Sequence, residues 1–282
     1  KNIHITLTSE RQKRKNTHLL EQVTKTQKEL KKKNTGMRED LELAAEVQES
    51  SLPDMPEQDF LKLEVHYAPF GDVSGDTYYI AQNRDQALNI FLGDATGHGV
   101  SAAFITMMAQ MALRTIRKDQ SPSKIIRQLN QEFGECTPGD KFMTAIFLQI
   151  HPNGALHACN AGHPPFIIIP SNPKKDILSF RQCGFALGLF PEELRPYPEI
   201  RYQLEPKDKI FLYTDGVTEW QNSEGDIFTE ERLLECLDEN RSRSMKKILE
   251  KLIEAVKEFA GETRCEDDLT LLGFKFEATD GS

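Results

Sequence analysis

Several acidic residues in this sequence stand where an apolar run meets a glycine-containing turn. Asp76 lies in DVSGD, Asp94 ends the run NIFLGD before ATGHG, and Asp215 ends KIFLYTD before a glycine. Asp267 and Asp268 precede the apolar run LTLLGF. A strand that delivers a carboxylate into such a turn holds it rigidly and lets backbone carbonyls approach the same point. Oxygen-rich shells of this kind suit hard cations such as Mg²⁺ and Mn²⁺.

Each of these aspartates, taken singly, is explained equally well as a turn residue or as the N-cap of a helix. Taken together they imply more, because carboxylates gathered in a low-dielectric site repel one another unless cations neutralise them. Whether they do gather depends on the elements that carry them.

The chain after residue 56 has the pattern of an α+β layered sandwich. Strands come first, then a helix pair, then more strands and a second helix pair, whereas a doubly wound parallel sheet would alternate one strand with one helix. Predicted strands cover 61–70, 76–81, 87–95, 141–150, 155–161, 164–170, 209–216 and 268–276. Predicted helices cover 101–116, 123–135, 229–239 and 244–260.

Residues before 56 differ in character and predict helix. Positions 19, 23, 26, 30, 33 and 37 follow the 4-3 spacing of a coiled-coil seam, apolar at Leu19, Val23, Leu30 and Met37. The spacing fits a dimer, and a single solvated helix is the alternative. A second helical face runs through 41–52 and ends at the prolines 53 and 56. We therefore expect a helical dimerisation and linker segment at 1–56, a folded domain at 57–277 and a tail at 278–282.

Composition excludes several classes of protein. The 282 residues hold 35 Lys and Arg against 44 Asp and Glu, a net charge of −9 that disfavours general nucleic-acid binding. No apolar run approaches the roughly 20 residues of a membrane span, so no direct membrane contact is expected. Five cysteines without a C-x-x-C pair predict a reducing, cytoplasmic setting. The first residue is Lys1, so we expect an upstream portion, which leaves a membrane tether there open.

The blocks GDATGHGVSAAF, FLYTDGVTE and DDLTLL, in that order, closely resemble the signatures of the PPM superfamily of metal-dependent serine/threonine phosphatases. The bacterial branch typified by stage II sporulation protein E and stress-response regulator U fits best. LAAEVQESSLP resembles the helix preceding the catalytic domain in that branch, and NAGHPPFII resembles its central hairpin. The resemblance runs from about Leu41 to Phe276. It implies a PPM-type α-β-β-α sandwich with a two-metal site between the sheets.

The resemblance also implies a ligand set. Asp76 matches the acid of the family's G-G-D block, and Asp94 matches that of G-D-x-x-G-H-G. Asp94 would bridge two ions, and Asp76 with the backbone carbonyl of Ala95 would complete one of them. Asp215 in T-D-G and Asp267 in D-D-x-T would hold the other. If the match to the D-D-x-T block is shifted by one residue, Asp268 is the ligand in place of Asp267.

Two such ions, Mn²⁺ or Mg²⁺, lower the pKa of a shared water and clamp phosphoryl oxygens for in-line displacement. The resemblance therefore implies a hydrolase of phosphoserine or phosphothreonine. By the same resemblance its substrate is an anti-sigma factor antagonist of a bacterial partner-switching stress response. An upstream sensor domain would signal through the N-terminal helix of a homodimer.

Three positions leave room for another interpretation. Ser74 replaces the first glycine of G-G-D, and Tyr79 stands where the branch often carries another Asp. Both favour a degenerate member that senses or binds a partner without catalysis, whereas the intact aspartates argue against it. His98 is either a general acid toward the leaving seryl oxygen or a cap for the helix starting near Val100. His163 is expected to pack in its hairpin.

Overall fold

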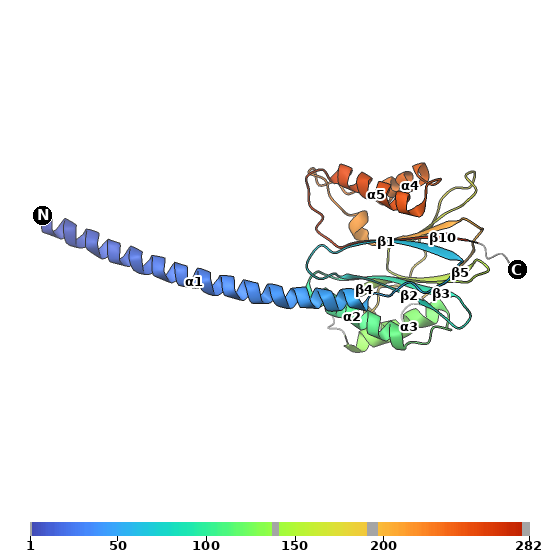
Figure 1. The fold of residues 1–282 in the computed structure, drawn as a ribbon, viewed down its shortest axis with the longest axis horizontal. Helices are drawn as coiled ribbons and strands as arrows, with labels where there is room; N and C mark the ends of the chain where they lie inside the picture. The colour runs from blue at the N-terminus through green and yellow to red at the C-terminus, as the bar shows by residue number, and fades with distance from the viewer. Residues whose placement is uncertain (1, 137–140, 191–196, 278–282) are drawn as a thin grey trace. The chain divides into compact units, whose positions relative to one another are not determined.

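The computed structural model describes residues 2–136, 141–190 and 197–277 (Figure 1). The chain divides into two compact units, Lys1–Glu46 and Val47–Ser282. The expected boundary after residue 56 stays a prediction, and the expected tail at 278–282 lies outside the described residues. No helix of the described part is long and apolar enough to cross a membrane.

The first unit is helical. Helix α1 runs over Asn2–Ser51 without a break, so the two predicted helical stretches are one helix, whose last turns belong to the second unit. A single interior glycine, Gly36, costs only about 1 kcal/mol relative to alanine and does not interrupt it. The apolar positions of the predicted seam are all exposed in the single chain: Leu19, Val23, Leu30 and Met37.

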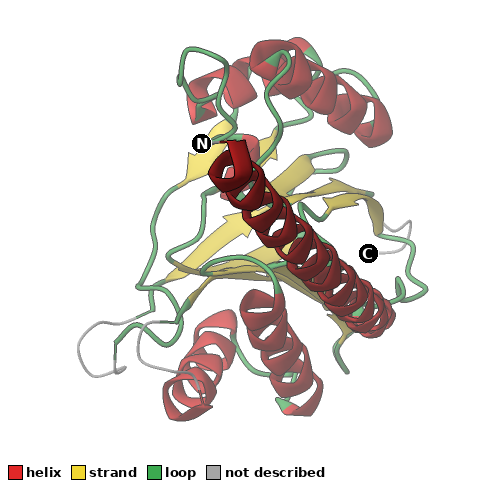
Figure 2. Ribbon diagram, turned by 90° about the vertical axis from the view of Figure 1, so that its left-hand side faces the viewer, coloured by secondary structure: helices red, strands yellow, loops and turns green. Residues whose placement is uncertain are grey.

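The second unit consists of four layers (Figures 1 and 2). One antiparallel sheet, the β1 sheet, has the order β1 (Leu61–Ala68), β10 (Leu269–Phe276), β9 (Lys209–Tyr213), β6 (Phe166–Ile169) and β7 (Leu178–Phe180). The other, the β2 sheet, has the order β2 (Asp76–Gln82), β3 (Leu88–Ala95), β4 (Met143–Ile150), β5 (Ala155–Ala161) and β8 (Glu199–Gln203). This arrangement confirms the α+β sandwich.

Helices cover the outer face of each sheet. Helices α2 (Val100–Thr115) and α3 (Pro122–Cys136) contact the β2 sheet, and α4 (Glu230–Glu239) and α5 (Met245–Ala260) lie on the β1 side (Figure 1). Three apolar clusters result, one between the sheets and one under each helix pair. Central strands such as β3 and β10 are buried on both faces, which is why they are apolar nearly throughout.

Strand pairing brings the first two aspartates together. In the antiparallel pair of β2 and β3, Asp76 lies directly opposite Asp94. In the next pair Asp94 lies opposite Thr144 on β4. Because directly opposed residues on one face of a sheet have Cβ atoms about 4.5–5.5 Å apart, this register alone makes the two carboxylates neighbours.

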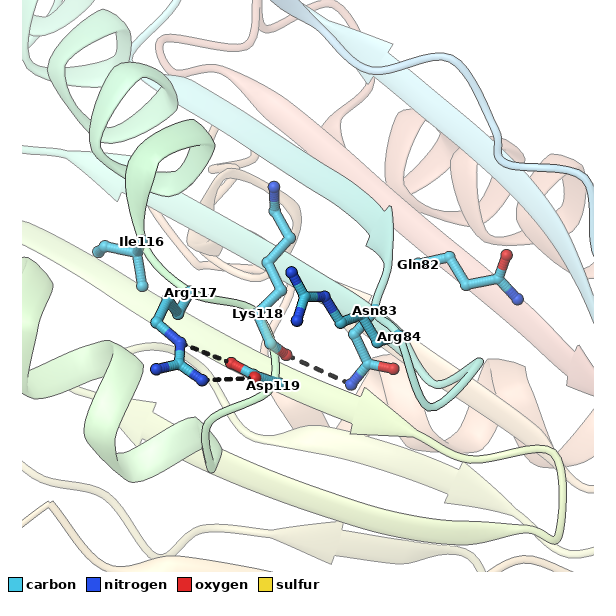
Figure 3. Close-up of a pocket in the computed structure, with 7 residues that line it drawn as sticks. All are labelled: Gln82, Asn83, Arg84, Ile116, Arg117, Lys118 and Asp119. Atoms are coloured by element: carbon cyan, nitrogen blue, oxygen red, sulfur yellow. Dashed lines mark hydrogen bonds and ion pairs between the residues drawn. The ribbon is translucent and has the colours of Figure 1, made fainter.

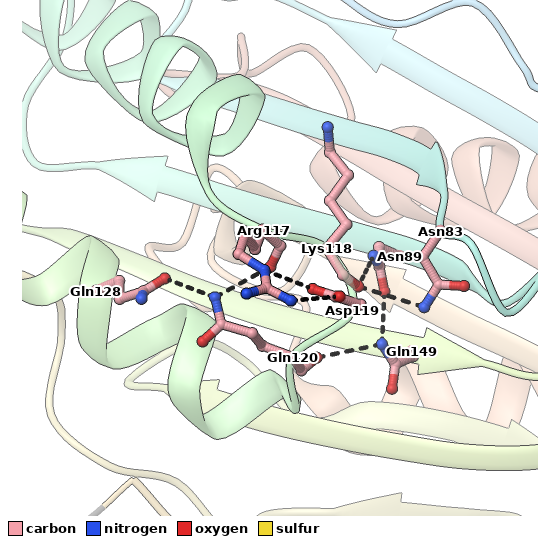
Figure 4. Close-up of polar contacts among 8 residues, drawn as sticks. All are labelled: Asn83, Asn89, Arg117, Lys118, Asp119, Gln120, Gln128 and Gln149. Carbon is pink, nitrogen blue, oxygen red and sulfur yellow. Dashed lines mark hydrogen bonds and ion pairs between the residues drawn. The ribbon is translucent and has the colours of Figure 1, made fainter.

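The other ends of β2 and β3 hold the connection between α2 and α3 (Figure 4). The side-chain amides of Asn83 and Asn89 both donate to the carbonyl of Lys118, at 3.3 and 2.9 Å. Gln149 Nε2 donates to Asn89 Oδ1 at 3.0 Å and to the Gln120 carbonyl at 3.3 Å. Three buried amides thus donate to backbone carbonyls of the α2–α3 connection, and these bonds hold the connection against the sheet.

Candidate metal centre

The aspartates of the sequence blocks meet where the two sheets face each other. Asp76 and Asp94 come from the β2 sheet, Asp215 follows β9 as the first residue of the short helix η2 (Asp215–Val217), and Asp267 lies just before β10. The charges of Asp76, Asp215, Asp267 and Asp268 each act on Asp94. The structure therefore places these five carboxylates in one electrostatic cluster.

Hydrogen bonds from the β1 sheet hold Asp76. Thr214 Oγ1 and Thr270 Oγ1 donate to Asp76 Oδ2 at 2.8 and 2.6 Å. Asp76 is 1% exposed, so these two hydroxyls stabilise a carboxylate that burial disfavours. Both hydroxyls donate to Oδ2, so Oδ1 takes no part in these two hydrogen bonds between the sheets.

Neighbouring Asp267 and Asp268 differ in what their carboxylates do. Asp268 is buried and accepts the backbone N–H of Phe70 at 2.8 Å and that of Gly75 at 2.5 Å. Both of its oxygens are thus used in holding the turn before Asp76. Asp267 is exposed at the rim and accepts the N–H of Asp268 on Oδ1 at 2.8 Å. The geometry favours Asp267 as the ion ligand and Asp268 as the residue that positions the turn.

Two glycines allow this close approach of loops. A Cβ on Gly75 would lie 3.2 Å from the carbonyl oxygens of Ala95 and Gly97, and the Ala95 N–H donates to the Gly75 carbonyl at 2.9 Å. The Ala95 carbonyl therefore lies beside the turn that leads into Asp76. A Cβ on Gly216 would collide with the backbone carbonyl of Asp268. Glycine at this position lets the Asp215 turn reach the loop of Asp267.

The last turn of α1 holds the other side of the Asp76 turn. Gln48, 5% exposed, donates from Nε2 to the Ser74 carbonyl at 2.7 Å and to Thr106 Oγ1 at 2.8 Å. Its Oε1 accepts the Ser74 N–H at 2.9 Å. One side chain thus links α1, α2 and the residue two positions before Asp76.

The electrostatics of the cluster fit a divalent cation. Burial, reinforced by the neighbouring carboxylates, raises the pKa of Asp94 to about 9 and the pKa of Asp76 well above its ordinary value. Burial also raises the pKa of Asp215 to about 6, with Glu219 and Asp267 adding to the effect. All of the donors, including the Ala95 carbonyl, are hard oxygens, and a cation among them would offset the repulsion. Within the described part of the chain, no three His, Cys, Asp or Glu side chains lie close enough together to hold a metal ion as they stand.

The raised pKa of Asp94 predicts a pH-dependent stability of the metal-free chain. An acid whose folded pKa is raised contributes stability that is lost as pH rises toward that pKa. We therefore expect the melting temperature to fall between about pH 7 and 9, with Asp94 as one cause and the buried Asp76, whose pKa is also raised, acting in the same direction. Asp94→Asn should flatten the fall, and Mg²⁺ should reverse it in the wild type. A fall that Asp94→Asn leaves unchanged would assign it to another group.

His98 lies at the rim near Asp267. Its side chain is exposed. Burial raises the pKa of Asp267, and a charge on His98 would act against that rise, which places the two residues within electrostatic range of each other. Helix α2 has Gly99 as its N-cap and no side-chain cap, so the structure does not support the capping interpretation of His98.

His163 lies inside its hairpin, as expected. His163 is buried, and its Nδ1 lies 2.9 Å from Thr144 Oγ1. The Asn160 side chain forms two hydrogen bonds to the backbone of His163: Nδ2 donates to the His163 carbonyl, and Oδ1 accepts the His163 N–H. Burial lowers the pKa of His163 to about 3, so its ring is neutral. His157 and His66 lie on β5 and β1.

The two departures from the G-G-D pattern have structural explanations. Ser74 Oγ accepts the Asp76 N–H at 3.0 Å and so replaces glycine with a side chain that supports the turn. Tyr79 packs on the helix-covered face of β2, with the Lys118 ammonium 5.2 Å from its ring centre. Residues three apart on a strand point to opposite faces, so a side chain at 79 does not reach the Asp76 site.

Sequence reasoning missed Thr214, Thr270 and Gln48. The two threonines stand inside the T-D-G and D-D-x-T blocks, so the block pattern itself carried a signal for them. Nothing in the sequence around Gln48 indicates its role, because that role depends on its contact with Ser74, 26 positions later in the chain.

Comparison with known proteins gives a family match. The profile of the Stage II sporulation protein E (SpoIIE) family matches residues 84–277. Phosphoserine phosphatase RsbP of Bacillus subtilis is 28% identical over 186 residues, 64% of this chain and 45% of RsbP. Phosphoserine phosphatase RsbU of the same organism is 23% identical over 239 residues, 84% of this chain and 70% of RsbU. The match thus spans less than half the length of RsbP.

Solved structures share the fold. The SiaA-PP2C domain of Pseudomonas aeruginosa superposes with a TM-score of 0.74 at 21% identity, over 86% of this chain and 98% of that domain. RsbX in complex with magnesium gives 0.59 at 18% identity, covering 79% of this chain and 99% of RsbX. The catalytic domain of the phosphatase PstP with two manganese ions gives 0.58 at 13% identity, covering 77% and 99%. The fold is therefore PP2C-like.

Proposed function

Since the chain belongs to the Stage II sporulation protein E family, we propose that it is a metal-dependent phosphatase that hydrolyses phosphoserine or phosphothreonine in proteins. The observation that carries the proposal is the cluster of carboxylates between the sheets, whose pKa values are raised by burial and by one another. Such a cluster is unfavourable without cations and is suited to hold them. RsbP and RsbU, two relatives of similar sequence, are phosphoserine phosphatases.

The residues that would hold the ions are Asp76, Asp94, the Ala95 carbonyl, Asp215 and Asp267. When bound, two Mn²⁺ or Mg²⁺ ions activate water and neutralise phosphoryl oxygens. The chain itself orients these donors: Thr214 and Thr270 fix Asp76, and Asp268 fixes the turn before it. The magnesium in RsbX and the two manganese ions in PstP support this choice of cofactor.

The activity can be tested on a simple phosphoester. We expect release of phosphate from p-nitrophenyl phosphate and from a phosphoserine peptide with Mn²⁺, and none after chelation. Asp85→Asn, an exposed aspartate beyond the far end of β2, is a matched control and should retain activity. Hydrolysis that survives chelation would contradict the role of metal, and no hydrolysis with Mn²⁺ would favour the non-enzymatic binding module.

We further propose that His98 protonates the leaving seryl oxygen, which its exposed place beside Asp267 supports. A general acid matters most for a poor leaving group such as an alkoxide and less for a phenolate. His98→Ala should therefore slow hydrolysis of a phosphoserine peptide by about a hundredfold and that of p-nitrophenyl phosphate much less. Steady-state rates on both substrates measure this. Equal losses on the two substrates would leave His98 without an acid role.

The proposed substrate is a phosphorylated anti-sigma factor antagonist, for which the similarity to RsbU is the support. We also propose that α1 dimerises through Leu19, Val23, Leu30 and Met37, since their exposure leaves an apolar seam uncovered in the single chain. The contact of Gln48 with Ser74 gives the end of α1 a direct link to the Asp76 turn.

Deleting residues 1–40 tests this link. We expect the truncated chain to dimerise more weakly, because the seam is removed, and to need a different Mn²⁺ concentration for half-maximal activity. Light scattering gives the mass, and an activation curve gives the metal requirement. Replacement of Leu19, Val23 and Leu30 by serine in the full chain should reproduce both effects. An unchanged mass with superimposable curves would leave α1 as a simple tether.

A further inference from the structure

A basic cavity lies at the end of the β1 sheet remote from the aspartates. Its volume is about 660 Å³. Lys209 begins β9 and Lys275 is the penultimate residue of β10, whereas Asp215 and Asp267 lie beyond the opposite ends of those strands. Six residues of β-strand span about 20 Å, so the cavity is separate from the metal centre. Among the described residues that line it there are one carboxylate, Glu64, and six cations: Lys62, Lys207, Lys209, Arg241, Arg243 and Lys275.

Nearby carboxylates offset only part of this charge. Glu277 pairs with Lys62 at 3.5 Å and with Lys275 at 2.7 Å. Asp238 pairs with Arg241 at 3.0 Å. Asp208, also close, uses its carboxylate to accept the backbone N–H groups of Ser171 at 2.7 Å and of Glu205 at 2.9 Å. Lys207 and Arg243 are exposed and form no ion pair with any described residue, so positive charge remains in excess.

Lys209 shows the excess most clearly. It is 8% exposed, and its ammonium donates to the carbonyl of Arg241. Burial lowers the pKa of Lys209, and the like charges of Lys275 and Arg241 lower it further. A buried ammonium beside two other cations is costly unless an anion joins them. The chain as a whole has a net charge of −9, yet five separate segments bring their cations together here. A bound anion would explain this clustering of positive charge.

Helix α5 adds to the positive field. It begins at Met245, which lines the cavity, and Ser244 caps it by accepting the Lys247 N–H. Its first turn contains no acidic residue, unlike that of α4, which has Glu230 and Glu231. The partial positive charge at the N-terminus of α5 is therefore not offset by an acidic side chain in the first turn of that helix.

We propose that the basic cavity binds a small molecule carrying two or more linked phosphate groups. Its volume falls in the range of small-ligand sites, about 300–1,000 Å³, and exceeds what a single phosphate fills. The cations come from β1, the turn before β9, β9, β10 and the α4–α5 connection, so they surround a centre. A nucleic-acid or peptide track would need them in a row. None of the lining residues in the described part of the chain has an aromatic ring that could stack on a base, so we assign the recognition to the phosphates.

The test is calorimetric titration of the metal-free full chain with tripolyphosphate. Metal-free conditions are needed because oligophosphates bind divalent cations and so would report on the metal centre. We expect one site per chain. The double variant Lys207→Gln/Arg243→Gln should weaken binding at least about tenfold, because each lost charge-assisted hydrogen bond reduces affinity severalfold or more. Both side chains are exposed, so circular dichroism should show an intact fold.

A second cavity provides the matched control (Figure 3). It measures about 520 Å³ and is lined by Arg84, Lys118 and Arg117, but Asp119 accepts two hydrogen bonds from the Arg117 guanidinium, at 3.2 and 2.7 Å. The variant Arg84→Gln/Lys118→Gln makes the same change in net charge there and should leave the tripolyphosphate affinity within about twofold.

Four results would overturn the proposal. One is the absence of tripolyphosphate binding to the wild type, and another is an equal loss of affinity in both double variants. A third is inorganic phosphate binding as tightly as tripolyphosphate, which would indicate a site for one phosphate. The fourth is a poly-glutamate peptide binding more tightly than tripolyphosphate, which would make the occupant an acidic protein segment. None of these results depends on phosphatase activity.

Discussion

Asp94→Asn and Asp215→Asn are expected to abolish Mn²⁺-dependent hydrolysis while the chain stays folded. Each substitution keeps the shape of the side chain and removes the negative charge that would hold an ion. Because metal ions contribute several kcal/mol to stabilising the transition state, we expect a loss of at least about a thousandfold in kcat/KM. Phosphate release from a phosphoserine peptide, measured across a range of Mn²⁺ concentrations, provides the test.

The fold should survive because these carboxylates are unfavourable without metal. Burial and neighbouring charges raise the pKa of both, so a neutral amide costs the metal-free chain little. Metal-free melting temperatures of both variants should equal or exceed that of the wild type. Asp85→Asn controls for the loss of one charge at an exposed position. Wild-type turnover in either site variant, with unchanged circular dichroism, would remove the two-metal proposal.

Asp267 and Asp268 should respond in opposite ways to the same substitution. Asp267→Asn is expected to weaken Mn²⁺ binding by about tenfold or more with little change in melting temperature, because its carboxylate is exposed and uses only Oδ1 to accept the Asp268 N–H. Asp268→Asn removes an acceptor from the part-buried N–H of Phe70 or from the buried N–H of Gly75. Losing an acceptor to a buried donor costs about 1–3 kcal/mol, equivalent to a fall of several degrees in melting temperature.

Calorimetry and thermal unfolding of the two variants separate these roles. Asp268→Ala should be more destabilising than Asp268→Asn, since both backbone donors then lose their acceptor. The assignment fails if Asp267→Asn lowers the melting temperature of the metal-free chain while Asp268→Asn only weakens metal binding. In that event Asp268 is the ligand and the frame shifts by one residue.

Much of the fold could be predicted because the central strands are buried on both faces. A strand such as β3 is an apolar run long enough to be recognised by itself, and its last residues carry Asp94 to the site. The edge strands β7 and β8 were not predicted. β7 has three residues and β8 reads EIRYQ, so neither has the apolar pattern of a central strand. Their pairing with β6 and β5 fixes them instead.

The sequence marks the acidic residues of the candidate site but not the contacts that support them. Asp76 and Asp94 are marked by the turns that follow or precede their strands, and the register places them opposite each other. The different roles of Asp267 and Asp268 depend on the backbone N–H groups of Phe70 and Gly75, nearly 200 positions away in the chain. No local pattern records such a contact. The amide of Gln48 is hidden from sequence for the same reason.

Calorimetric titration of the chain with Mn²⁺, with a phosphatase assay on the same samples, tests the central proposal most directly. We predict binding of two ions per chain and hydrolysis of a phosphoserine peptide that rises with their occupancy. Binding of two ions without any hydrolysis, or hydrolysis that does not follow occupancy, would contradict the account.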